Sequence, residues 1–292
     1  MRLMAIKKKI AETCSALSDV PVIGGILKPK PKIAVVRMSG VIADSNTKRG
    51  GISFQKYESI LENAFDLHNL KAVALLINSP GGSPAQSQLI GDKIRQLAEE
   101  KEVPVYAFTE DVAASGGYWL ACAADEIYAV PSSIIGSIGV ISASFGFKEL
   151  IERYGIERRV HTAGKDKSFL DPFTEEKPAD VKRLKSLQKD LHTLFTGWVK
   201  ERRGQKVNGT DKELFEGAFW TAEKALEYGL IDGLESYKPM CKERFGDDVK
   251  FINFGPEKGF ISSLINPDAK MNMARDTADI LEEKAIWGRF GL

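Results

Sequence analysis

Ser115 stands where a strand is expected to give way to a helix, and two glycines follow it directly. A serine at a helix start commonly acts only as an N-cap, because its hydroxyl satisfies free backbone N–H groups. Gly116 and Gly117 indicate more than a cap, because a backbone without side chains would let a substrate carbonyl come close to the hydroxyl. Free N–H groups and the helix dipole would also favour a developing negative charge. The pattern therefore makes Ser115 a candidate nucleophile for acyl transfer.

A serine hydroxyl is a weak nucleophile until a base accepts its proton, so the chain must supply a base. Histidine is one candidate, and the Ala113-x-Ser115-x-Gly117 spacing is a loose variant of the nucleophile elbow of α/β-hydrolases. The chain has only three histidines, however: His68, His161 and His192. Their positions do not favour a triad, and their spacing is not that of metal ligands. We therefore expect no metal and no cofactor.

Lysine is the second candidate base, as in the serine–lysine variants of the triad. A lysine accepts a proton only when it is neutral, so burial or nearby positive charge must lower its pKa. Two lysines, Lys165 and Lys167, lie on a polar loop at residues 162–168. The residue types alone do not choose between them.

In a third interpretation the serine is not a nucleophile at all. The same glycine-rich loops could form an oxyanion hole for an acyl-CoA enolate, as in crotonase-type enzymes. Such an enzyme needs a carboxylate acid or base near the site, and Glu110 and Asp111 leave that open.

The composition excludes several classes of protein. The 292 residues are 43% hydrophobic and 28% charged, which fits a globular protein. The net charge of +1 gives no sign of the strongly basic surface that binds nucleic acid. Three widely spaced cysteines indicate a reducing compartment. No run approaches the roughly 18 to 20 apolar residues that span a bilayer, and lysines at 7–9 interrupt any signal peptide. We expect a cytoplasmic protein, with the amphipathic segment at 1–17 as a candidate peripheral membrane contact.

Strands and helices are predicted to alternate along the first half of the chain. This order favours a parallel sheet with helices on both faces, whose active groups lie at the carboxyl ends of the strands. The polar stretches at 78–82 and at Ser115 both follow such strands. Strands are expected at 33–38, 73–77, 103–108, 126–130, 158–161 and 249–254, and helices at 54–70, 85–100, 115–124, 147–154, 179–203 and 277–284, with turns at 131–140.

Four motifs together resemble the signal peptide peptidase A family, whose members are serine–lysine peptidases of the Clp-protease/crotonase fold. They are Asn78-Ser79-Pro80-Gly81-Gly82, Ala114-Ser115-Gly116-Gly117-Tyr118, Gly136-Ser137-Ile138-Gly139-Val140 and Lys165-Asp166-Lys167-Ser168. The resemblance implies an α/β fold: a repeated β-β-α superhelix with a largely parallel sheet covered by helices, plus helical extensions. We expect an arm or linker at 1–30, the peptidase domain at 31–240, and an extension at 241–292 that packs on the core or on a neighbouring subunit.

Transferred to the matching positions, the resemblance implies a role for each site residue. Ser115 would be the nucleophile, and Lys167, which directly precedes Ser168 as the family lysine precedes a serine, the general base. Ser137 would orient the lysine amine. The backbone N–H groups of Gly82 and Gly116 would form the oxyanion hole, with Gly81 and Gly117 binding substrate beside them.

The resemblance also implies partners. Such chains assemble into homo-oligomeric rings or domes in which the lysine can come from the neighbouring protomer, so the sites lie at subunit interfaces. The expected substrates are signal-peptide remnants or other unfolded or membrane-derived peptides. We expect this chain to depart from the family in having no N-terminal transmembrane anchor. A crotonase-type acyl-CoA hydrolase or isomerase and a non-catalytic scaffold of the same fold are the alternatives.

Overall fold

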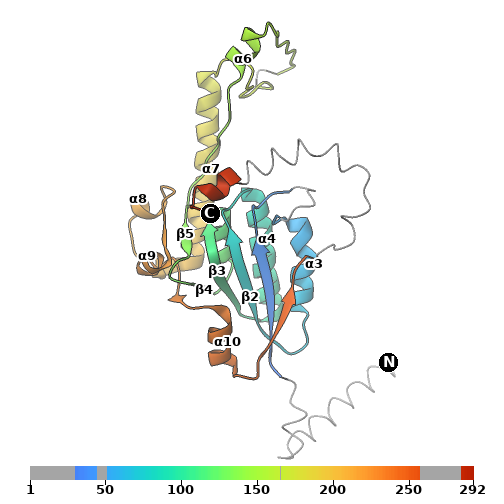
Figure 1. Cartoon of the computed structure of the whole chain (residues 1–292), viewed down its shortest axis with the longest axis vertical. Helices are drawn as coiled ribbons and strands as arrows, with labels where there is room; N and C mark the ends of the chain where they lie inside the picture. The colour runs from blue at the N-terminus through green and yellow to red at the C-terminus, as the bar shows by residue number, and fades with distance from the viewer. Residues whose placement is uncertain (1–29, 45–50, 165, 257–283) are drawn as a thin grey trace, which may run out of the picture.

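The computed structural model describes residues 30–44, 51–164, 166–256 and 284–292 (Figure 1). Eight strands in this part of the chain form one sheet, in the order β6-β5-β3-β2-β1-β8, with β4 paired to β3 and β7 to β4. They are β1 (Lys32–Ser39), β2 (Leu70–Ser79), β3 (Val105–Ala114), β4 (Glu126–Ala129), β5 (Ile134–Gly136), β6 (Phe219–Thr221), β7 (Gly233–Leu234) and β8 (Lys250–Phe254). Every pair is parallel except β5 with β6, which confirms the predicted largely parallel sheet.

Helices cover both faces of the sheet. Helices α3 (Phe54–Phe65), α4 (Pro84–Lys101) and α5 (Gly116–Ala121) pack with one set of strand side chains, such as Leu75. Helix α10 (Tyr237–Phe245) packs with the alternate set, such as Leu76, on the opposite face. The remaining helices are α6 (Lys148–Arg153), α7 (Pro178–Arg203), α8 (Asp211–Leu214), α9 (Ala222–Glu227) and the 3-10 turn Gly204–Lys206.

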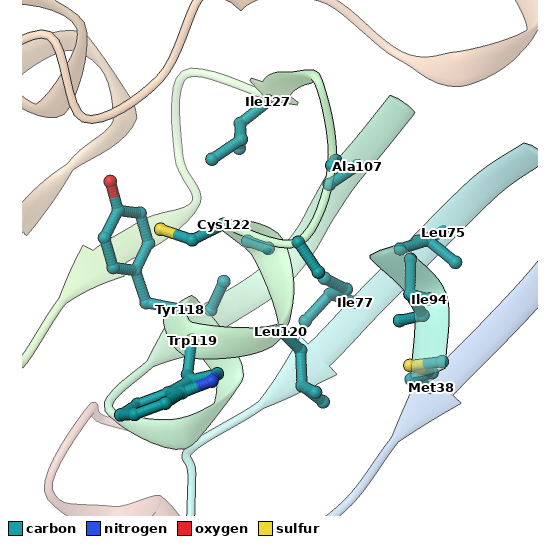
Figure 2. Close-up of a cluster of buried hydrophobic side chains, with 14 of the residues drawn as sticks. Met38, Leu75, Ile77, Ile94, Ala107, Tyr118, Trp119, Leu120, Cys122 and Ile127 are labelled. Carbon is teal, nitrogen blue, oxygen red and sulfur yellow. The ribbon is translucent and has the colours of Figure 1, made fainter. Parts of the chain in front are cut away.

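Helix α5 lies inside the larger of the two cores. All six of its residues are buried, which explains why it is apolar on every side. Figure 2 shows Leu120 of this helix near Ile77 of the sheet, with Ile94 of α4 beyond, whereas Trp119 points away from these side chains. The Trp119 ring packs on Phe195 and Trp198 of α7. The helix that follows Ser115 is therefore held by close packing.

Helix α7 joins this core to a projecting segment, which we call the arm: residues 140–164 and 166–190, comprising α6 and the first half of α7. Figure 1 shows α6 and that half of α7 extending away from the sheet. At its other end α7 packs on α5, where the rings of Trp198 and Trp119 stack 6.0 Å apart. The arm exposes large apolar side chains instead of burying them, among them Ile141, Phe145, Leu150, Tyr154, Ile156 and Leu187.

Several predicted elements differ from the observed ones. The strand predicted at 158–161 is wrong, because those residues form no strand and are exposed. Residues 134–136 form β5 where only turns were expected, and α10 was not predicted. Strand β3 continues to Ala114, beyond the predicted end at 108.

Other expectations lie wholly or mostly outside the described residues: the arm or linker at 1–30 except for its last residue, Lys165, and the helix at 277–284. The described end of the chain packs on its own body, since the ring of Phe290 lies 5.1 Å from that of Phe219. None of the helices described here has the length and apolar character needed to cross a membrane.

Candidate active site

Ser115 sits in an unusual backbone conformation between β3 and α5. Its φ of 53° and ψ of −122° lie outside the regions that side chains favour, and such a conformation typically costs about 1–3 kcal/mol. Its backbone N–H donates to the Gly136 carbonyl at 2.8 Å, which helps to hold it. Ser115 occupies the N-cap position, yet its hydroxyl makes no capping hydrogen bond. The hydroxyl is therefore not used to cap the helix.

Glycines let the loops after β2 and β3 touch through their backbones. A side chain at Gly81 would place its Cβ 2.7 Å from the Ser115 Cβ, and one at Gly117 would lie 2.5 Å from the Ser79 carbonyl oxygen. Gly82 has a φ of 145°, and a Cβ there would lie 2.0 Å from the Ile42 oxygen. The two loops can approach this closely only because these positions carry no side chain.

Two backbone N–H groups, those of Gly82 and Gly116, lie close to Ser115. Ile42 fixes the first loop, since its N–H donates to Gly81 at 2.8 Å and its carbonyl accepts from Ser83 at 2.7 Å. A Cβ built on Gly116 would lie 3.4 Å from the Gly82 nitrogen, so the two amides are neighbours. Within the described residues, neither Gly82 nor Gly116 donates its N–H to a backbone acceptor. This pair of free donors suits a developing oxyanion.

Ser137 is brought next to Ser115 by strand pairing. Strands β3 and β5 run parallel with Ala114 opposite Gly136, so the residues that follow them leave the sheet side by side. Ser137 is 7% exposed, has a φ of 52°, and donates its backbone N–H to Ala218 at 2.6 Å. The structure therefore gathers both serines and both glycine amides.

Lys167 is not brought to the same place within one chain. It is exposed on the arm, and its loop is attached to the start of α7 by the ion pair of Asp166 with Arg183. From Arg183 to Trp198, which contacts α5, the helix axis advances about 22 Å. The base expected from the sequence and the nucleophile thus lie on well-separated parts of the molecule.

The histidines do not serve Ser115 in the structure. His192 Nε2 is 2.6 Å from the Phe215 carbonyl oxygen. His68 is exposed and precedes the amino end of β2, the end opposite to the site, and His161 is exposed on the arm. The histidine triad considered from the spacing around Ser115 is thus not formed in this chain.

The two carboxylates considered for a crotonase-type site both have partners. Glu110 forms an ion pair with Arg37 at 2.8 Å. Asp111 accepts a hydrogen bond from the Asn78 side chain at 2.6 Å.

Buried polar contacts anchor the far side of α5. The Tyr118 hydroxyl donates to the Leu230 carbonyl at 2.7 Å. Nearby, Arg203, whose side chain is 2% exposed, pairs with Asp232 at 2.6 Å. Burial raises the pKa of the Cys122 thiol to about 12, so this thiol stays protonated and is no competing nucleophile.

Sequence reasoning missed two residues that support the site, Asn78 and Ser133. Asn78 opens one of the four motifs, but the motif alone did not show what its side chain bonds. Ser133 lies in a stretch read as turns, where a serine is unremarkable. Their contacts with the strand that leads to Ser115 become visible only in three dimensions.

Comparison with known proteins places this site in a family. A model of peptidase family S49 matches residues 97–244, which is half of the chain and includes Ser115, Ser137 and Lys167. The chain belongs to peptidase family S49. Membership confirms the resemblance to the signal peptide peptidase A family and, at the level of the family, the expectation of a serine peptidase.

Individual relatives of this S49 chain carry different names. It is 46% identical over 273 residues to the Na(+)/H(+) antiporter NhaA of Brucella abortus, a match that covers 89% of this chain. It is 31% identical over 72% of its length to the chloroplastic serine protease SPPA of Arabidopsis thaliana, and 29% identical over 70% to Protease 4 of Haemophilus influenzae. The S49 chain spans only 37%, 31% and 33% of these proteins, so their names describe longer molecules.

Proposed function

We propose that this chain is a serine endopeptidase in which Ser115 is the nucleophile and Lys167 of a neighbouring protomer is the general base. The observation that carries the proposal is the pairing of β3 with β5. That pairing sets Ser115 beside Ser137. The free N–H groups of Gly82 and Gly116 lie close to Ser115, and Lys167 is exposed on the arm.

The reaction would proceed by acyl transfer. Neutral Lys167 takes the proton of the Ser115 hydroxyl, and the oxygen attacks the peptide carbonyl. The N–H groups of Gly82 and Gly116 hold the oxyanion, where losing one donor typically costs about 2.7–4 kcal/mol of barrier. The protonated lysine then gives its proton to the leaving amine, and water hydrolyses the acyl-serine ester. Ser137 orients the lysine amine by a hydrogen bond.

Delivery of the lysine by a neighbour rests on the character of the arm. Helix α6 has no buried residue, and the side chains of Phe145 and Tyr154 are 79% and 73% exposed. Among the described residues the Phe145 ring contacts only the neighbouring ring of Phe147, at 6.3 Å, and most of its surface stays exposed. A second copy of the chain would cover such exposed apolar side chains. A homo-oligomer closed as a ring or dome would repeat the contact and complete a site at every interface.

The proposed substrates are unfolded or membrane-derived peptides, including signal-peptide remnants. An extended peptide suits a site built from backbone groups of loops, because main-chain hydrogen bonds can hold any sequence. Gly81 and Gly117 would keep the backbone beside Ser115 open to such a chain.

Fluorophosphonate labelling of the full-length protein tests the proposal. These probes react with activated serines, so the wild type should be labelled at Ser115 and the Ser115→Ala variant should not. Ser132→Ala is the matched control, because Ser132 is exposed, and it should label like the wild type. Equal labelling of Ser115→Ala and wild type would reject the proposal. Tight binding of coenzyme A together with unlabelled Ser115 would instead favour the crotonase-type alternative.

A further inference from the structure

Strand β3 carries an irregularity just before Ser115. Ile77 of β2 pairs with Thr109, but Ser79 pairs with Ala113, so β3 contains two more residues than β2 over this interval. The bulge falls at residues 110–112. A bulge leaves backbone groups without partners in the strand ladder, and those groups must find other partners when they are buried.

The side chain of Asn78 supplies partners on one side of this bulge. Its Oδ1 accepts a hydrogen bond from the Val112 N–H at 3.2 Å, and its Nδ2 donates to Asp111 Oδ2 at 2.6 Å. On its other side, the Asn78 carbonyl accepts from the Gly40 N–H at 3.0 Å. Asn78 lies at the carboxyl end of β2, and the loop that contains Gly82 begins directly after that strand. One side chain therefore connects the strand that leads to Gly82 with the segment that ends at Ser115.

Ser133 holds the same bulge from the other neighbouring segment. Its side chain is fully buried, and its hydroxyl lies 2.5 Å from the Glu110 carbonyl oxygen and 3.3 Å from that of Thr109. Ser133 directly precedes β5, the strand that leads to Ser137. The bulge is thus bonded both to the end of the strand that leads to Gly82 and to the segment that leads to Ser137.

We infer that Asn78 and Ser133 are positioning residues of the peptidase, acting through the bulge at residues 110–112. They fix the spacing between the three segments that carry the oxyanion donor, the nucleophile and Ser137. This inference rests on the proposed function. Neither side chain needs to touch a substrate, and a displacement of about 1 Å in such a site can cost about 100-fold in rate. Their loss therefore affects the chemical step more than binding.

The kinetics of fluorophosphonate labelling on the full-length protein separate these two effects. Asn78→Ala and Ser133→Ala should each lower the maximal labelling rate about 10- to 100-fold, while the probe concentration for half-maximal rate changes less than about threefold. Matched controls are Asn253→Ala and Ser132→Ala, which change exposed residues and should leave both constants unaltered. Wild-type maximal rates in both Asn78→Ala and Ser133→Ala would overturn the inference.

An exchange of polar groups provides a second test that does not depend on removing a side chain. Asn78→Asp alone would put two carboxylates where Asn78 now donates to Asp111, and should label at least about 10-fold more slowly. Adding Asp111→Asn should restore the rate to within about threefold, because the new amide at 111 can donate to the new carboxylate at 78. A double variant as slow as Asn78→Asp would overturn the inference. Absence of wild-type labelling at Ser115 would instead reject the proposed peptidase itself.

Discussion

The two parts of the proposed site differ sharply in how the chain holds them. The nucleophile lies between a buried helix and a strand whose bulge is held by hydrogen bonds from Asn78 and Ser133. All residues of that helix, 116–121, are buried. The arm has the opposite character, because α6 contains no buried residue and Lys167 is exposed. One part is fixed by its own chain, and the other leaves large apolar side chains exposed.

This difference indicates where each part obtains its geometry. A strained residue such as Ser115 persists only when its surroundings over-determine it, and the core around α5 does so. The arm needs no such core if a second copy of the chain supplies its packing. The contrast can be tested by changing one part and measuring which property responds.

The largest effect is expected from Lys167→Ala, which should lower kcat/KM for peptide cleavage about 10²- to 10⁴-fold by removing the base. The melting temperature should not change, because the side chain is exposed. Lys185→Ala, another exposed lysine, is the control. Mixing Lys167→Ala with Ser115→Ala subunits should recover part of the activity. If the mixture stays inactive although subunits exchange, the lysine serves its own chain.

A large loss of stability is expected from Asp232→Asn, because it leaves the buried Arg203 without a counter-charge. We expect a loss of about 3–5 kcal/mol in urea unfolding. Lys206→Met, which changes a half-exposed partner of the same carboxylate, should cost about 0–1 kcal/mol. Equal losses in both variants would contradict the role of burial.

The same variant should respond to pH. Burial opposes ionisation of Asp232, but hydrogen bonds from Arg203 and Lys206 outweigh it and lower its pKa below the ordinary 3.8. A pKa that is lower in the folded protein adds stability at pH values above the pKa of the unfolded chain. This stability is lost as the pH falls through the pKa of the folded protein. The difference in the free energy of unfolding between wild type and Asp232→Asn, measured in urea, should therefore become smaller below about pH 4.

A smaller effect is expected at the base of α7. Trp198→Phe keeps a ring against Trp119 but loses the hydrogen bond from Nε1 to the Trp119 carbonyl, now 3.0 Å long. The expected loss is about 1–2 kcal/mol in the free energy of unfolding. Leu194→Ala on the same helix, 57% exposed, should stay within about 0.5 kcal/mol.

The smallest effect on folding is expected at the tip of the arm. Tyr154→Ser should change the free energy of unfolding of a single chain by less than about 0.5 kcal/mol, since the side chain is 73% exposed. The same change should weaken self-association in sedimentation velocity, because it removes apolar surface from the proposed contact. Unaltered association would move the interface away from this residue.

Most of the sheet could be predicted from the sequence because buried parallel strands appear as apolar runs. The runs at 33–38 and 73–77 lie within β1 and β2. Strand β5 was missed because three residues ending in glycine look like a turn until they pair with β3. The strand expected at 158–161 failed because those residues have no neighbouring strand and Arg158 instead pairs with Asp171.

The candidate site was predictable only in part. The two serines and the glycine amides were identified through the motifs, and the structure brings these four residues together. The supporting role of Asn78 could not be predicted, because it depends on a register shift between two strands that no local pattern encodes. The remoteness of Lys167 within one chain likewise follows from the direction of α7.

The length of α7 has a mechanical consequence. Its 26 residues make a rod about 39 Å long, attached to the nucleophile helix at one end and carrying the lysine loop at the other. A tilt of about 5° at the attachment would move the far end by about 3 Å, roughly the length of a hydrogen bond. The residues at the attached end, Trp198, Arg202 and Arg203, bond to α5 or to residues around it. In the proposed oligomer, the stiffness of these contacts would therefore set how accurately Lys167 is placed at a neighbouring site.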